Sequence, residues 1–385
     1  MNVRDLLIAL VRYAINGDAI DVEAIKGWLS EEKMVALYKV SKGHDMAHLV
    51  AYALLENGIS PKGEMGQILQ VEIEQSKLRY EMMEADCQEI YDLFESEKID
   101  YMPLKGAVIR GIYPEPWMRT SCDIDILVRP DDLQKAKELL VQHLNYRMDS
   151  DVAYHDISLY SPFGMHIELH HSIKENNEKF DKILGGVWEF AYPAIPNGHK
   201  YVQSNTYLLF HMIAHTAYHF ASGGCGMRSV LDIWLLRRVI DFNVQELRSL
   251  LADSELDRFY SKITELGEYW FGNEKQADSV VLEMEKYVLL GGTYGVNGQS
   301  AVFKRAKNGG RLRYFFSRLF LPYDNLAVLY PVVKKHKILT PFCQIARWFG
   351  VIFKTKRIAN EAKRIVAAND NEVRNVASLL ESLGL

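Results

Sequence analysis

Cysteine is scarce in this chain of 385 residues, and the four that occur are widely scattered. They form no C-x-x-C pair, so the sequence offers neither a zinc knuckle nor a disulfide framework and indicates a reducing compartment. Long hydrophobic runs are also missing. The longest late apolar stretch, Phe342 to Phe353, contains Arg347 and is too short to span a bilayer. We therefore expect a cytoplasmic protein without a transmembrane segment.

Targeting, repeat and nucleic-acid signatures are absent as well. The first apolar run is broken by Arg12 and lacks a small-residue cleavage site, so we expect no signal peptide. No internal repeat or low-complexity tract is visible. The aromatic-rich motifs of RNA-binding modules are missing too, which leaves nucleic acid as a partner without a supporting motif.

Negative charge is in modest excess, but it is unevenly spread. The net charge is −5, whereas residues 301–366 hold fifteen Lys and Arg against Asp324 and Glu361, a net +13. Such a segment can meet nucleic acid, a phosphorylated substrate or an anionic membrane, or it can offset the acidic remainder within the molecule. The amphipathic stretch from Leu339 to Phe353 keeps open a role as an assembly factor on membrane surfaces.

Three regions follow from the periodicity along the chain. Residues 1–97 read as helical, with a long helix from Gly66 to Ser96 that carries an apolar stripe. Residues 98–200 alternate short strands and helices and include a hairpin signature at 161–164. Residues 201–385 are helical again and contain the basic segment 301–366. The order of elements predicts an α+β fold with a mixed sheet and helices on one face, flanked by N-terminal and C-terminal helical regions.

Two carboxylates stand one residue apart in an apolar strand, at Asp123 and Asp125. Alternate side chains of a strand emerge on one face, so both point the same way. Glu168, again between apolar neighbours, supplies a third carboxylate from a further strand. A divalent cation is the natural partner, since Mg²⁺ takes protein carboxylates together with phosphate oxygens. The alternative is a set of surface acids neutralised by nearby Arg and Lys.

Four stretches resemble the nucleotidyltransferases with a DNA polymerase beta-like palm: Leu104 to Gly106, Tyr113-Pro114, Arg119 to Val128 and Ile167 to His170. Within that superfamily, the sequence is most similar to a bacterial subgroup of uncharacterised nucleotidyltransferases. The resemblance implies a palm-like sheet and the transfer of a nucleoside monophosphate from a nucleoside triphosphate to an acceptor hydroxyl, with release of pyrophosphate. It also implies two Mg²⁺ ions, or Mn²⁺ in their place, held by Asp123, Asp125 and Glu168. Glu168 would complete the second metal site or accept the proton of the hydroxyl.

The residues expected to bind the nucleotide flank the aspartate strand. Lys105 and Gly106 would hold the triphosphate, because glycine allows close backbone approach. Arg119 and Ser121 would contact phosphate oxygens. The alternatives are a simple turn with an exposed lysine, and an Arg119 that pairs with an acidic neighbour, Asp123 or Glu115. The sequence departs from the superfamily pattern after Gly106, where Ala107 supplies no hydroxyl.

Histidines form two further patterns. His166 and His170 alternate with Glu168 on one strand face, which keeps a transition-metal site open. His211, His215 and His219 share one helix face at i, i+4 and i+8. We expect this face to line the cleft opposite the sheet, where His211 or His215 contacts the nucleotide or substrate, or else to pack between structural units. The acceptor is not readable, and a catalytically silent nucleotide-binding or regulatory protein on the same fold is the alternative function. The oligomeric state is equally unreadable.

Overall fold

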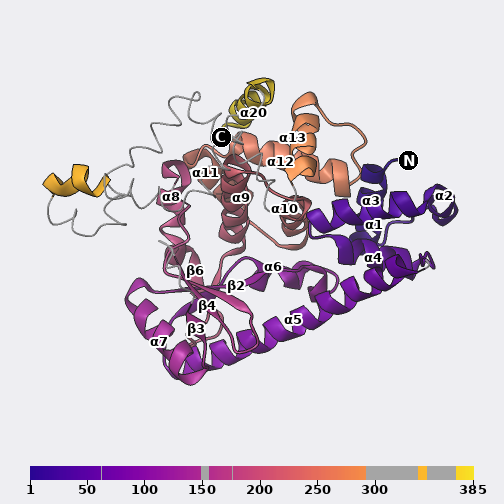
Figure 1. The fold of residues 1–385 in the computed structure, drawn as a ribbon. Coiled ribbons are helices and arrows are strands. Elements are labelled where there is room, and N and C mark those ends of the chain that lie inside the picture. The colour runs from indigo at the N-terminus through magenta and orange to yellow at the C-terminus, as the bar shows by residue number, and fades with distance from the viewer. Residues whose placement is uncertain (62, 149–155, 176, 292–336, 345–369) are drawn as a thin grey trace.

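The fold, seen in a computed structural model, is described for all residues except 62, 149–155, 176, 292–336 and 345–369 (Figure 1). Four helices form the N-terminal end: α1 (Val3–Asn16), α2 (Val22–Trp28), α3 (Glu31–Gly43) and α4 (Ala47–Glu56). Local sequence sets their ends. Asp21, for example, accepts a hydrogen bond from the Ala24 amide at 3.0 Å, which satisfies one of the free N–H groups at the start of α2.

Helix α5 (Glu64–Ser96) is 33 residues long and runs from the N-terminal helices to the sheet (Figure 1). The predicted helix over 66–96 is thereby confirmed, with its start two residues earlier. Its apolar stripe is buried as the helical period requires, through Leu69, Met83, Cys87, Ile90 and Phe94. The stripe contacts different partners along its length, because its first residue packs with the N-terminal helices and the others pack on the sheet.

The central sheet has five strands in the order β1-β2-β5-β4-β3. Strands β2 and β5 are parallel, and the other pairs are antiparallel. The strands are β1 (Tyr101–Pro103), β2 (Asp123–Val128), β3 (Arg147–Met148), β4 (Asp156–Tyr160) and β5 (His166–His170). The predicted hairpin joins β4 to β5, and its turn is closed by a bond from the Ser161 amide to the Met165 carbonyl at 2.8 Å. The expected α+β class with a mixed sheet is confirmed.

The two faces of the sheet differ in chemistry. On one face, Ile124, Ile126 and Val128 of β2 join a core with α5 and α7 (Leu133–His143). The intervening side chains of β2 and β5 emerge on the opposite face, because the side-chain period of a strand is two. Asp125 and Glu168 therefore lie on the face that α5 and α7 leave uncovered. The helix that begins at Gly106 is short: α6 (Gly106–Ile109) continues as a 3-10 turn.

The described residues after β5 form helices and one small hairpin, made of β6 (Ala191–Pro193) and β7 (Tyr201–Gln203). The helices are α8 (Glu178–Leu184), α9 (Asn205–Ser222), α10 (Met227–Val239), α11 (Val244–Asp253), α12 (Asp257–Phe271), α13 (Ser279–Gly291) and α20 (Asp370–Leu383). Helices from both ends of the chain share one hydrophobic core, which includes Leu10 of α1, Phe210 of α9 and Trp270 of α12. The boundaries at 97 and 200 stay a prediction.

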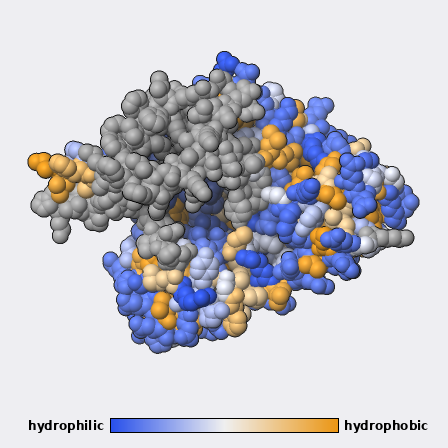
Figure 2. All heavy atoms as spheres, viewed as in Figure 1, coloured by the Kyte–Doolittle hydropathy of each residue, from blue (hydrophilic) through white to orange (hydrophobic). Residues whose placement is uncertain are grey.

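The described surface is mixed in character, and most of the basic segment lies outside the described residues. On the face shown in Figure 2, the described residues are mostly hydrophilic, with hydrophobic ones interspersed. Of the basic segment 301–366, only residues 337–344 are described, and most of the amphipathic stretch proposed for membranes likewise lies outside the described residues. Within the described part of the chain, no helix combines the length and the apolar character needed to cross a membrane.

Candidate functional site

Three carboxylates converge where β2 and β5 run side by side. The parallel register places Asp125 opposite Glu168 and Asp123 opposite His166, so their side chains share one face. The ligand atoms of Asp123, His166 and Glu168 lie within 4.8 Å of one another, and so do those of Asp125, Glu168 and His170. We call these five residues the acidic cluster. The cluster contains all three predicted carboxylates and adds two histidines of β5.

Asp125 is the most tightly held member of the cluster. Its Oδ1 accepts hydrogen bonds from Lys105 Nζ at 2.9 Å and from His170 Nε2 at 2.8 Å. Burial alone would raise the pKa of Asp125, but the two cationic partners outweigh it and hold that pKa well below its usual range. The same bonds act on His170, because burial would lower its pKa whereas Asp125 and Glu168 raise it to about 9. His170 is therefore protonated at neutral pH.

The pKa values of the other two carboxylates are shifted in opposite directions. Burial and the negative charges of Asp125 and Glu168 raise the pKa of Asp123. A hydrogen bond from His170 lowers the pKa of Glu168, although burial opposes this effect. On Asp123, burial and repulsion thus outweigh the attraction of Lys105 and His166. A dication between these oxygens would relieve the repulsion, since carboxylate oxygens are the ligands that hard divalent cations take.

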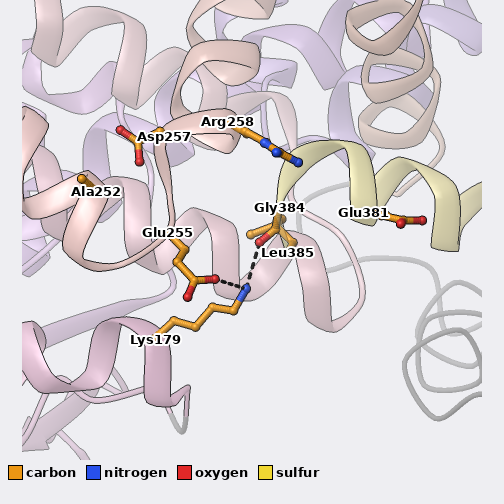
Figure 3. Close-up of a pocket in the computed structure, with 8 residues that line it drawn as sticks. All are labelled: Lys179, Ala252, Glu255, Asp257, Arg258, Glu381, Gly384 and Leu385. Carbon is orange, nitrogen blue, oxygen red and sulfur yellow. Dashed lines mark hydrogen bonds and ion pairs between the residues drawn. The ribbon is translucent and has the colours of Figure 1, made fainter.

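A cavity of about 180 Å³ lies beside the acidic cluster. We call it the α9 pocket; its wall includes Lys105, Glu168, Glu175, His211, His215 and His219. The predicted placement of the α9 histidines opposite the sheet is what the structure shows. A larger cavity of about 540 Å³ lies elsewhere, where Lys179 of α8 pairs with Glu255 and contacts the C-terminal Gly384 (Figure 3). No member of the acidic cluster lines it.

A comparison with known protein families identifies the family of this chain. The model of a family described as uncharacterised nucleotidyltransferase matches residues 30–272, more than half of the sequence. The chain belongs to this family. The matched range includes the whole sheet and the helices from α3 to α12. The family model therefore covers the helices around the sheet as well as its strands. A search of curated proteins finds no match.

Lys105, Gly106, Arg119 and Ser121, the residues next to the aspartate strand that were predicted to bind nucleotide, are engaged with other protein groups in this member of the family. Lys105 is bonded to Asp125, and its backbone has a φ of +44°, a conformation that costs energy outside glycine. At Gly106, an added Cβ would collide with the Arg119 guanidinium and would lie 3.1 Å from Ser121 Oγ. Glycine is therefore needed here for the close approach of these two side chains. Ser121 Oγ in turn accepts a bond from Arg110 at 3.3 Å.

Arg119 is buried against α10 rather than paired with Asp123 or Glu115. Its Nη2 lies 3.0 Å from Asp232 Oδ2, and the Tyr113 hydroxyl donates to Asp232 Oδ1 at 2.7 Å. Both members of the ion pair are less than a tenth exposed. The pair fixes the segment that leads into β2, because Arg119 stands four residues before Asp123. Phosphate binding by Arg119 and Ser121 stays a prediction.

Replacing Asp232 with Asn is expected to destabilise the protein by about 3–5 kcal/mol, because Arg119 would stay buried without its countercharge. Urea unfolding of the variant would measure this loss. The double variant Arg119→Met with Asp232→Leu removes both charges and is expected to recover most of the stability. A double variant as unstable as the single one would show that the pair contributes through packing and not through charge compensation.

Sequence reasoning missed several residues that hold the site. Arg79 of α5 donates to the carbonyls of Ser121 and Cys122 at 2.7 and 3.0 Å, directly before the aspartate strand. Arg110 and Glu175 also escaped notice. A partial signal existed for Asp232, whose i, i+4 spacing from Arg228 marks a polar face on α10. Arg79 had none, since a lone arginine on a long helix is ordinarily a solvated residue.

Proposed function

We propose that this protein is a divalent-cation-dependent nucleotidyltransferase of the DNA polymerase beta-like type. It would move a nucleoside monophosphate from a nucleoside triphosphate to an acceptor hydroxyl. The observation that carries the proposal is the convergence of Asp123, Asp125 and Glu168 from two parallel strands, beside a pocket, in a member of a nucleotidyltransferase family. Paired carboxylates that hold cations against a triphosphate are a recurrent arrangement for phosphoryl chemistry.

The donor atoms suit Mg²⁺ or Mn²⁺. Asp123, Asp125 and Glu168 offer oxygens, and His166 can complete the first ligand set. His170 cannot bind a cation while it is protonated and bonded to Asp125. When bound, such cations neutralise phosphate oxygens and lower the pKa of an attacking hydroxyl. The protein itself keeps the ligands in place: Lys105 and His170 fix the Asp125 carboxylate, and His170 also lies 3.4 Å from Glu168. The first ligand set needs the least rearrangement, because Asp123 has no such cationic partner among the ion pairs of the described residues.

One observation favours the alternative of a catalytically silent nucleotide-binding or regulatory protein. Asp125 is already neutralised within the protein by Lys105 and His170. A cation that binds Asp125 has to compete with both groups. A protein that binds a nucleotide without a cation at Asp125 would keep this pairing and lack turnover.

Label transfer separates the two functions. We expect purified protein, Mg²⁺ and nucleoside triphosphates labelled at the α-phosphate to transfer label to a component of cell extract and to release pyrophosphate. The Asp123→Asn variant should lose both signals. Asp131→Asn is the matched control, because Asp131 is an exposed acid outside the cluster. Nucleotide binding without label transfer in any extract fraction would contradict the enzyme and support the silent protein.

A further inference from the structure

A short segment leads into the aspartate strand, and each of its five residues is bonded to a side chain from another part of the chain. We call residues 118–122 the lead-in segment. Its bonds come from α4, from the turn before α4, from α5 and from α10. The side chains that make them are those of His48, Asp45, Arg79, Arg228 and Asp232. Helices that precede and follow the strands in the sequence therefore meet on one stretch of backbone.

The centre of the lead-in segment is held at Thr120. Its hydroxyl donates to Asp45 Oδ2 at 2.6 Å, and its carbonyl accepts a bond from Arg228 Nη1 at 3.0 Å. Arg228 also pairs with Asp45, so the three groups are bonded to one another in a closed set. Thr120 stands three residues before Asp123 and is fixed through both its side chain and its backbone.

Arg79 makes the contacts nearest to the acidic cluster. Its Nε donates to the Ser121 carbonyl at 2.7 Å, and its Nη2 donates to the Cys122 carbonyl at 3.0 Å. Among the ion pairs of the described residues, none involves Arg79, so these two carbonyls are its main partners. A planar guanidinium that holds two successive carbonyls fixes the direction of the backbone as well as its position. The next residue along the chain is Asp123.

Asp123 depends on its backbone for its position more than the other two carboxylates of the cluster do. Lys105 and His170 hold Asp125 by hydrogen bonds, and His170 also lies close to Glu168. The Asp123 side chain, in contrast, makes no hydrogen bond or ion pair within the described part of the chain. Asp123 is also the first residue of β2, so the hydrogen bonds of the sheet fix the backbone only on its C-terminal side. The lead-in segment supplies the restraint on the other side.

We propose that Arg79 is a positioning residue for the nucleotidyl transfer: it fixes the backbone before Asp123 and so places the Asp123 carboxylate against His166 and Glu168. The inference rests on the proposed function, because it assumes that Asp123 binds a cation. Arg79 is itself a cation and acts through the backbone, not as a ligand. Helix α5, whose first half packs with the N-terminal helices, thereby supports one cation ligand of the site.

The direction of one change separates this role from a purely electrostatic one. Arg79 carries a positive charge near the cluster, so the loss of that charge alone would strengthen the binding of a cation. Loss of the ligand position would weaken it. Arg79→Met is expected to raise the Kd for Mn²⁺, measured by electron paramagnetic resonance, about tenfold, as is usual for a residue that orients a metal ligand. Arg79→Lys keeps the charge but not the planar fork, so its Kd is expected to rise by a smaller factor.

Arg248→Met, at an exposed arginine of α11, is the matched control and should leave the Kd for Mn²⁺ unchanged. Circular dichroism shows whether each variant is folded, and Arg79→Lys carries the test if Arg79→Met is not. An unchanged or lower Kd in the folded Arg79 variant would overturn the positioning role and leave the proposed function intact. An unmodified protein that binds Mn²⁺ but transfers no label would remove the proposed function alone, because the Kd still reports the position of Asp123. An unmodified protein that binds no Mn²⁺ would overturn both.

Discussion

Asn in place of Asp125 is expected to destabilise the protein, whereas Asn in place of Asp123 is expected to stabilise it, although both changes strongly reduce transfer. Asp125 is the countercharge of Lys105 and His170, so its loss leaves two buried cations without a partner. Breaking a buried ion pair in this way costs about 3–5 kcal/mol. Burial and the repulsion of Asp125 and Glu168 raise the pKa of Asp123, and neutralising this residue removes both costs.

Urea unfolding without divalent cations measures the two opposite shifts, with Asp131→Asn as the exposed control. Label transfer should fall about 10³-fold in both cluster variants, because each loses a cation ligand worth several kcal/mol in the transition state. Added Mn²⁺ should stabilise the unmodified protein, and the gain should be smaller in both variants. Equal destabilisation by the two substitutions would contradict the assignment of Asp125 as the paired carboxylate and Asp123 as the repelled one.

Acid is expected to unfold the protein well before its carboxylates are protonated, because of two histidines of α9. Burial, followed by the charges of neighbouring groups, lowers the pKa of His211 and of His215 to about 3. An unfolded histidine titrates near 6.5, so below that pH the unfolded chain binds protons that the folded chain refuses. Stability is therefore complete above about pH 6.5 and falls as the pH decreases. At about pH 5 each histidine costs about 2 kcal/mol.

His170 changes the stability in the opposite direction as the pH varies. Its pKa is raised to about 9 in the folded protein, so its contribution is complete below about pH 6.5 and is lost as the pH rises through 9. The full loss amounts to about 3 kcal/mol. We thus expect a stability maximum near neutral pH, measured by urea unfolding across the range. His211→Gln should flatten the acid limb and His170→Gln the alkaline limb. An acid limb that is unchanged in His211→Gln would contradict the neutral, buried state of the ring.

The local pattern of the sequence was sufficient for α5, for the acidic strand β2 and for the hairpin of β4 and β5. The stripe on α5 and the alternation of Asp123 with Ile124 reflect periods of 3.6 and 2 that the backbone imposes on any helix or strand. The hairpin between β4 and β5 follows from the Gly164 turn in the same local way. The α+β class followed from the order of these elements. The roles proposed for Lys105, Gly106, Arg119 and Ser121 came from the family resemblance and await experiment.

Tertiary packing alone decided which charges meet. Arg119 finds Asp232 across 113 residues, and His215 finds Glu175 across 40. No short-range period encodes such pairs, because they depend on how α9 and α10 pack against the sheet. The sequence by itself determined that Asp123, Asp125 and Glu168 lie on extended segments with apolar neighbours. The packed structure determined that Asp125 is the neutralised carboxylate and that a histidine-lined pocket lies beside the cluster. The physical reason is that interactions between charged and polar groups become strong where packing excludes water, and only the tertiary structure decides where that happens.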